Sequence, residues 1–280
     1  MQPTSHHKRI ASGLVLLAVL AGCLYLGGWP LRIFIGLAGA LALWEFYRML
    51  WPGRALLPDK AAGLAGALLL CLFDSPIALP ALFLYAAMRF LLKYGRRKTV
   101  DSPEPAVPDQ PPDAPVNLAD QALLVFGFIY LPMSLHLIAG LELLDQLAVF
   151  LAVAASDTGA YYAGSFLGRH KIWPKVSPQK STEGALGGLC ASLVLLIAFG
   201  LLIYAPERPG FTVLDWALAG ILLSIAAQMC DFFESAIKRR FGVKDSGNLI
   251  PGHGGVLDRL DSLVFALPVY VFICRPLMAA

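Results

Sequence analysis

The chain has 280 residues, of which 58% are hydrophobic and only 15% are charged. Soluble domains are roughly 45–50% apolar and about 25% charged, so this composition excludes an ordinary soluble protein. It predicts an all-α, polytopic integral membrane protein. The five cysteines form no C-x-x-C pair, and the sequence therefore indicates neither a zinc site nor a disulfide framework.

Apolar runs along the chain are long enough to be membrane spans. A helix needs about 20 apolar residues to cross a hydrocarbon core about 30 Å thick. On this basis we predict about nine transmembrane helices, of which the third and the ninth have the weakest support. They cover residues 10–28, 31–50, 57–74, 76–93, 118–139, 142–164, 184–205, 213–234 and 260–277.

Residues 99–117 interrupt the apolar pattern. They are rich in Pro and Asp, which predicts a solvated cytoplasmic linker. We expect residues 1–98 to form a transmembrane scaffold of about four helices and residues 118–280 a catalytic region of about five. The later spans contain carboxylates that cost about 2.5–3.5 kcal/mol each near the centre of a membrane helix, so a functional role explains them best. Their glycines, among them Gly159 and Gly187, should let the helices pack closely.

The positions of Lys and Arg predict the orientation. Basic loops remain in the cytoplasm, and with a cytoplasmic N-terminus only Arg32, Arg208 and Arg275 of the 22 basic residues face outward. Nine spans then place the C-terminus outside. The net charge of +3 is explained by this topology, and nucleic-acid binding is not expected.

The segment from Ser235 to Ser262 is unusual because charge and glycine are concentrated between two apolar spans. Cations offset the charge of phosphoryl oxygens, and paired carboxylates hold the divalent ion that bridges them. A glycine turn such as residues 252–255 lets backbone N–H groups approach an anion. This segment therefore indicates binding of phosphate together with a metal ion.

The same segment resembles the signature of the phosphatidate cytidylyltransferases, or CDP-diacylglycerol synthases. The pattern S-x-x-K-R-x-x-x-x-K-D-x-x-x-x-x-P-x-H-G-G-x-x-D-R-x-D is matched by Ser235, Lys238, Arg239, Lys244, Asp245, Pro251, His253, Gly254, Gly255, Asp258, Arg259 and Asp261. Residues 156–161 and 174–184 are similar to two further elements of the family, S-D-T-x-A-Y and S-P-K-K-T-x-E-G. Cys230 and Thr182 depart from the usual residues, Gly and an aromatic side chain, without removing a charge.

The carboxylates are candidates for a metal site. Asp231, Glu234, Ser235 and Lys238 have the i, i+3, i+4, i+7 spacing of one helix face, which points either into a site or along a membrane interface with internal ion pairs. Asp258 either caps a helix or binds a metal. The resemblance supports a metal, and we expect Mg²⁺ to be held by Asp231, Asp258 and Asp261. A second cation is left open.

Catalytic roles are assigned to Asp258, Asp231, Lys238 and Arg259. The expected substrate-binding residues are Lys175, Ser177, Lys180, Ser181, Arg239, Lys244, His253, Gly254, Gly255 and Asp157. Asp157 binds the nucleotide, braces a cation, or belongs to a structural hydrogen bond with a neighbouring span. For His253 we expect a phosphate contact and assign no role as general base, because the attacking phosphate is already ionised.

The resemblance implies that the protein joins CTP to phosphatidate, giving CDP-diacylglycerol and pyrophosphate, among the lipids of a bacterial inner (plasma) membrane. Two alternatives remain at this point: a CTP-dependent kinase of a lipid alcohol, and an ion-coupled transporter. A transporter would carry its carboxylates near the bilayer midplane, whereas these lie at helix ends beside cations. Whether the chain forms a homodimer is left open by the sequence.

Overall fold

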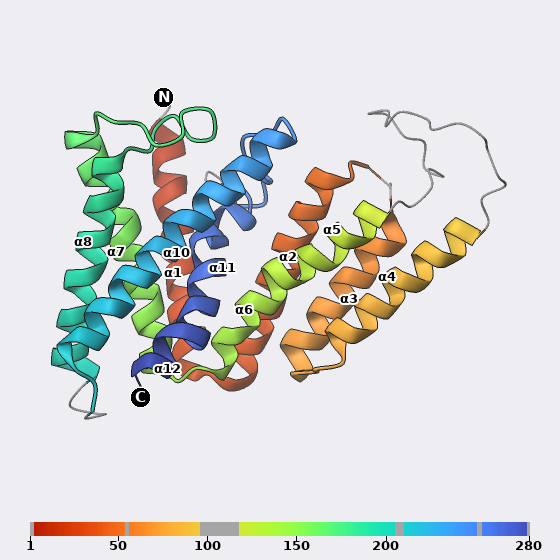
Figure 1. Ribbon diagram of the computed structural model, residues 1–280, viewed down its shortest axis with the longest axis horizontal. Coiled ribbons are helices and arrows are strands. Elements are labelled where there is room, and N and C mark those ends of the chain that lie inside the picture. Colours follow the sequence, from red (N-terminus) through yellow and green to blue (C-terminus); the bar gives the residue numbers. More distant parts are fainter. Residues whose placement is uncertain (1–2, 54–55, 96–117, 205–209, 251–253, 279–280) are drawn as a thin grey trace. The chain divides into compact units, whose positions relative to one another are not determined.

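The computed structural model describes residues 3–53, 56–95, 118–204, 210–250 and 254–278. Within these ranges the chain is helical, with two isolated β-bridges and no β-strand (Figure 1). The prediction of an all-α protein is confirmed for this part of the chain. The predicted linker, residues 99–117, lies wholly outside the described residues.

The helices follow one another as the apolar runs predict. The first four are α1 (Pro3–Leu26), α2 (Gly28–Leu50), α3 (Leu57–Phe73) and α4 (Ala78–Gly95). The next four elements are consecutive helical segments: α5 (Leu118–Phe128), the π-helix η1 (Ile129–Met133), α6 (Ser134–His136) and the 3-10 helix η2 (Leu137–Gly140). The remainder are α7 (Leu143–Leu167), α8 (Thr182–Phe199) with the π-helix η3 (Gly200–Tyr204), α10 (Val213–Arg240), and α11 (Leu257–Val269) with the π-helix η4 (Tyr270–Cys274) and α12 (Arg275–Met278).

Six helices in the described part of the chain are long and apolar enough to cross a membrane, so the chain is an integral membrane protein. They cover Gly28–Leu50, Leu118–Gly140, Leu143–Leu167, Thr182–Tyr204, Val213–Arg240 and Leu257–Met278. The last of them is the ninth predicted span. In α1 only Gly13–Leu26 is apolar, and in α4 only Ala78–Leu92. The 17 residues of α3 reach about 26 Å at about 1.5 Å per residue. A count of about nine spans therefore stays a prediction.

Contacts divide the chain into two compact units, residues 32–136 and residues 1–31 with 137–280. The core of the first unit is aromatic and includes Phe46, Tyr47 and Phe128. Arg89 on α4 donates to the buried carboxylate of Asp59 on α3 at 3.3 Å, which ties these helices together. These units are defined by packing, whereas the predicted boundary at residues 99–117 marks a change of composition.

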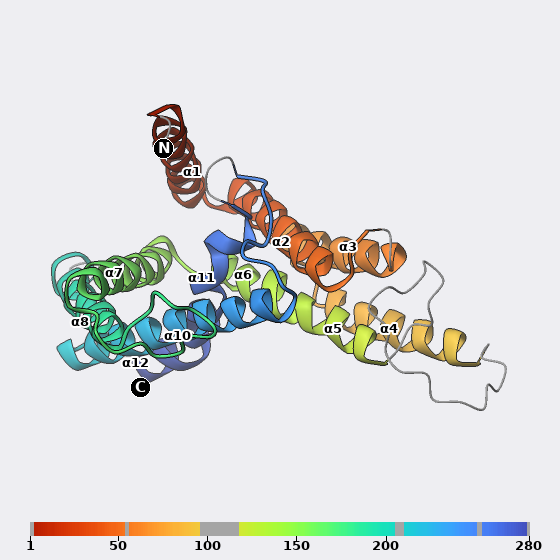
Figure 2. The same cartoon turned by 90° about the horizontal axis from the view of Figure 1, so that it is seen from above.

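In the unit formed by residues 1–31 and 137–280, α7 and α8 lie side by side in both views (Figure 1, Figure 2). A Cβ atom at Gly187 would lie 2.2 Å from the Cβ of Ala163, and one at Gly159 would lie 2.6 Å from the carbonyl oxygen of Gly187. Glycine at these positions therefore lets the backbones approach, as the sequence predicts. Since α10 packs against both α8 and α11, the four helices bring their polar residues together.

Candidate active site

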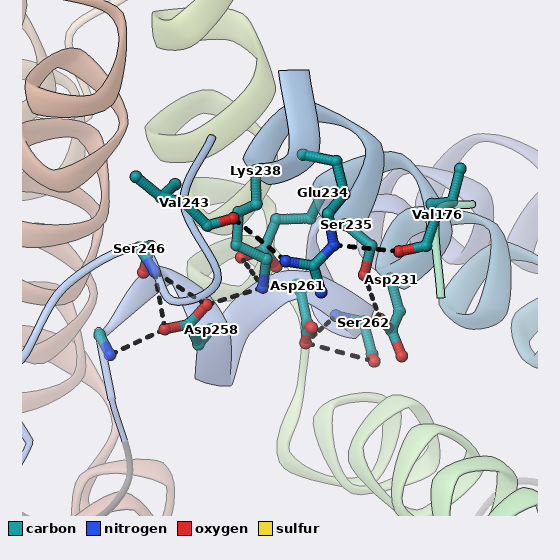
Figure 3. A network of polar contacts seen from close by, with 12 residues as sticks. Val176, Asp231, Glu234, Ser235, Lys238, Val243, Ser246, Asp258, Asp261 and Ser262 are labelled. Carbon is teal, nitrogen blue, oxygen red and sulfur yellow. Dashed lines mark hydrogen bonds and ion pairs between the residues drawn. The ribbon is translucent and has the colours of Figure 1, made fainter. Parts of the chain in front are cut away.

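The end of α10 and the start of α11 carry most of the predicted site residues. Asp231, Glu234, Ser235 and Lys238 lie on successive turns of α10, and the hydroxyl of Ser235 donates to Asp231 at 3.5 Å. Asp258 and Asp261 are one turn apart on α11. Figure 3 shows the side chains of both helices facing the same volume. The predicted grouping of these residues on one helix face is therefore present.

Asp258 is a centre of hydrogen bonding. Its side chain is only 8% exposed, and Lys238 Nζ donates to Oδ1 at 2.8 Å. The backbone N–H groups of Ser246 and Gly255 donate to Oδ2 at 3.0 and 2.9 Å. Gly254 has φ of 88°, and a Cβ atom there would lie 2.9 Å from Asp258 Oδ2. Asp258 thus holds the segment between α10 and α11 against the start of α11, although the N-cap residue of that helix is Val256, which makes no side-chain capping bond.

Lys238 lies between two carboxylates. Its Nζ is 3.0 Å from Glu234 Oε1, in addition to its bond with Asp258. The Glu234 side chain is 1% exposed and that of Lys238 is 11% exposed. The expected pairing within α10 therefore exists, and it is buried inside the protein. In this arrangement Lys238 offsets the charge of buried carboxylates.

Three carboxylates from three helices also approach one another. Asp157 on α7 lies within electrostatic range of Asp231 and Asp261, and Asp261 neighbours Glu234. Like charges held together in this way favour a bound cation, and carboxylate oxygens are the ligands that Mg²⁺ prefers. The donor set therefore suits a divalent cation. As the side chains stand, no three His, Cys, Asp or Glu groups of the described residues form a metal-binding cluster.

A cavity of about 590 Å³ opens beside these carboxylates. Asp157, Lys180, Asp231 and Gln228 all line it. Lys180 forms an ion pair with Asp231, and its Nζ lies 4.3 Å from the centre of the Phe232 ring. One of the predicted substrate-binding lysines therefore lies directly at a predicted metal ligand, inside a cavity with both polar and apolar walls.

The sequence indicated no role for Gln228. Its side chain belongs to a hydrogen-bond network that connects α7, α8 and α10 near the carboxylates. Its Nε2 lies 3.1 Å from the carbonyl oxygen of Ala185 on α8 and 3.0 Å from the hydroxyl oxygen of Ser224 on α10. Ser224 is in turn hydrogen-bonded to Ser156 on α7 at 2.8 Å. A glutamine in an apolar run three residues before Asp231 was a usable signal, because buried amides need partners.

The segment 168–181 between α7 and α8 covers one side of the cavity. The carboxylate of Glu183 accepts hydrogen bonds from the backbone N–H groups of Arg169 and His170 at 3.1 and 3.2 Å. Ser181 caps α8 by accepting the N–H of Gly184 at 3.2 Å, and it lines the cavity. Lys175 is exposed in this segment, and Ser177 makes a backbone bond to Trp173.

The other predicted residues are distributed around this centre. Lys244 and Arg259 are exposed, whereas Gly255 is buried and its backbone N–H donates to Asp258. Arg239 donates to backbone carbonyl groups. The prediction for His253 falls outside the described residues. The structure therefore brings Asp157, Lys180, Asp231, Lys238, Asp258 and Asp261 together, and the contacts of the other residues with substrate stay predictions.

Comparison with known proteins identifies the family. The sequence profile of the cytidylyltransferase family matches residues 7–277, nearly the whole chain. The chain belongs to this family. A protein of Bacillus subtilis (strain 168) named phosphatidate cytidylyltransferase is 33% identical, over 95% of this chain and 96% of its own length. The resemblance noted in the sequence is thereby confirmed.

Two staphylococcal relatives are more similar over a shorter region. A protein of Staphylococcus saprophyticus with the same name is 42% identical over 56% of this chain and 57% of its own length. One from Staphylococcus aureus (strain COL), also so named, is 47% identical over 44% of this chain and 46% of its own length.

Proposed function

We propose that this protein is a phosphatidate cytidylyltransferase, which joins CTP to phosphatidate and releases CDP-diacylglycerol and pyrophosphate. The observation that carries the proposal is the match along almost the full length to a relative of that name. The cluster of carboxylates and cations at the ends of α10 and α11 is what such a reaction requires, because it must bring two polyanions together. A lipid-alcohol kinase and an ion-coupled transporter are not favoured by these relatives.

The reaction is a single displacement at phosphorus. A phosphate oxygen of phosphatidate forms a bond with the α-phosphorus of CTP, and the bond from that phosphorus to the bridging oxygen of the β-phosphate breaks. Pyrophosphate leaves with that oxygen. The attacking phosphate monoester is largely ionised near neutral pH, so the protein need not supply a base. The task of the protein is to position the substrates and to offset their charge.

The carboxylates are proposed to hold a divalent cation, which we expect to be Mg²⁺. When bound, such an ion would offset the negative charge of the substrate phosphates. Asp231 and Asp261 are the best placed ligands, because both lie within electrostatic range of Asp157. Asp258 is the third proposed ligand, and its Oδ1 also accepts a hydrogen bond from Lys238 Nζ at 2.8 Å. We expect Lys180, which pairs with Asp231, to contact a phosphate when the cation is bound.

The substrates are proposed to approach from two directions. CTP is soluble, and the polar segments 168–181 and 241–250 provide it with cations, among them Lys175, Lys180 and Lys244. Arg259 and the turn around Gly254 are proposed to contact phosphate as well. Phosphatidate stays in the bilayer and would enter between helices. This arrangement requires the site to lie at the cytoplasmic side of a bacterial inner membrane.

A homodimer would leave this arrangement unchanged. The mass of the purified complex in detergent tests whether the protein forms one.

The decisive experiment follows the label of CTP. Purified protein in detergent should transfer label from the α-phosphate of CTP to phosphatidate and release pyrophosphate. Diacylglycerol and dolichol should give no product, because they lack the attacking phosphate. A γ-phosphate label in the lipid would identify a lipid kinase instead. Absence of any lipid product with each nucleotide tried would contradict the proposal.

A further inference from the structure

Arg239 is the last but one residue of α10, and its guanidinium group reaches two separate segments of backbone. Nε donates to the carbonyl oxygen of Val176 at 3.4 Å, and Nη1 donates to that of Val243 at 3.2 Å. In Figure 3 the two valines are labelled, and each lies at the end of a dashed line that marks one of these hydrogen bonds. Both acceptors are main-chain oxygens in the segments between helices.

Each of these segments has its own anchor at the site. Segment 168–181 is held by the ion pair of Lys180 with Asp231, and Trp173 packs edge-on against Phe232 with ring centres 4.8 Å apart. Segment 241–250 is held through the bond from Ser246 to Asp258. The anchors belong to different helices, since Asp231 is on α10 and Asp258 is on α11. A group that binds both segments therefore fixes their separation across the site.

We propose that Arg239 is a positioning residue, which holds segments 168–181 and 241–250 at a fixed separation in the protein without substrate. The part of the proposal that concerns CTP rests on the proposed function, because these segments carry the lysines assigned to that substrate. The geometry supports this role over a simple phosphate contact. Two different nitrogens of one planar group serve two acceptors, and a guanidinium presents its donors in such a rigid fork.

Lysine provides the critical comparison. Arg239→Lys keeps the positive charge, but its single ammonium group on a flexible stem cannot reproduce the two-sided fork. If Arg239 only offset phosphate charge, lysine should substitute well and glutamine poorly. If Arg239 positions the segments, both substitutions should loosen them. Arg240 is an exposed neighbour on the same helix, so Arg240→Lys and Arg240→Gln are matched controls.

Hydrogen–deuterium exchange of the intact protein, without substrate, measures the positioning directly. The reporters are the amides of Val176 and Ser177, which bond to the Trp173 carbonyl, and that of Val243, which bonds to the Lys238 carbonyl. We expect Arg239→Lys to raise exchange about fivefold or more in both segments, since loss of the fork lowers the free energy of local opening. The Arg240 variants should match wild type.

Steady-state kinetics completes the test. Arg239→Lys should raise KM for CTP by about fivefold or more, because loosened segments must be ordered when substrate binds. The proposal would be overturned if one of the two segments exchanged at the wild-type rate in both Arg239 variants. It would also be overturned if KM for CTP were normal in Arg239→Lys and raised in Arg239→Gln. The exchange result does not depend on turnover. A protein that makes no CDP-diacylglycerol would therefore refute the proposed function and leave the positioning role to be judged by exchange.

Discussion

Asp231 and Asp258 are both predicted metal ligands, but their present partners differ. Asp231 pairs with the side chain of Lys180, whereas Asp258 also accepts backbone N–H groups of Ser246 and Gly255. Replacing either carboxylate by an amide removes the charge needed for a cation. Only the change at Asp258 should also weaken hydrogen bonds to the backbone. An amide has one acceptor oxygen, whereas the two carboxylate oxygens of Asp258 accept from Lys238 and from two backbone N–H groups.

We therefore expect Asp231→Asn and Asp258→Asn each to lower kcat by about 100-fold or more, the order of effect seen when electrostatic groups of a site are removed. Rates measured over a titration of Mg²⁺ test this. Hydrogen exchange in residues 241–250 should rise in Asp258→Asn and stay unchanged in Asp231→Asn. A folded Asp231→Asn protein with near-normal turnover would show that this carboxylate is not needed for the ion.

The pair α7 and α8 shows how an element of structure supports the site. Asp157 lies on α7 and Lys180 immediately before α8, and the distance between these helices is set by glycine. Since a Cβ atom at Gly187 would overlap the Cβ of Ala163, Gly187→Ala must push the helices apart. The same pair therefore controls both the packing of this unit and the width of the cavity.

Gly187→Ala should destabilise the protein by about 1–3 kcal/mol, the usual cost of overpacking. Gly22→Ala in α1 is the matched control, because nothing lies within 4 Å of its Cβ position. That change should be neutral or stabilise by up to about 1 kcal/mol, since alanine is the better helix former. Denaturation in detergent, followed by circular dichroism, measures both. Equal stability of the two variants would contradict the close approach of α7 and α8.

For the whole molecule, the basic residues predict a topology that the proposed reaction also requires. CTP is a cytoplasmic metabolite, so the segment around Lys244 should lie in the cytoplasm. The N-terminus and the linker near Pro105 should lie on the same side and Ala280 on the other, because nine spans are an odd number. Six helices in the described part of the chain meet the criteria for a span, and labelling at these four positions tests the predicted count of nine.

Single cysteines placed at these four positions, in a background without the native cysteines, can be labelled in intact cells with an impermeant reagent. Only the cysteine at position 280 should react before the membrane is opened. Labelling of positions 244 and 280 from the same side would exclude nine spans. Labelling of position 244 from outside would also contradict a site that receives CTP from the cytoplasm.

The sequence alone determined the helical membrane class and the family. Placing polar groups in lipid is costly, so each segment that crosses the membrane must itself be apolar and helical. This requirement can be read from each stretch of sequence separately. The motifs identified the family because they fix residue types at fixed spacing. The spacing of Asp231, Glu234 and Lys238 also predicted their common face correctly.

Only the tertiary structure decided which partners the charged groups have on other helices and segments. That Lys238 reaches Asp258 as well as Glu234, that Lys180 pairs with Asp231, and that Arg239 bonds to Val176 depends on contacts between residues far apart in the chain. The residue pattern of a helix specifies the chemistry of each side chain but not its neighbours, because the same helix face can contact solvent, lipid or another helix. The partners are set when α7, α8, α10 and α11 pack, and glycine at their contacts sets how closely they approach.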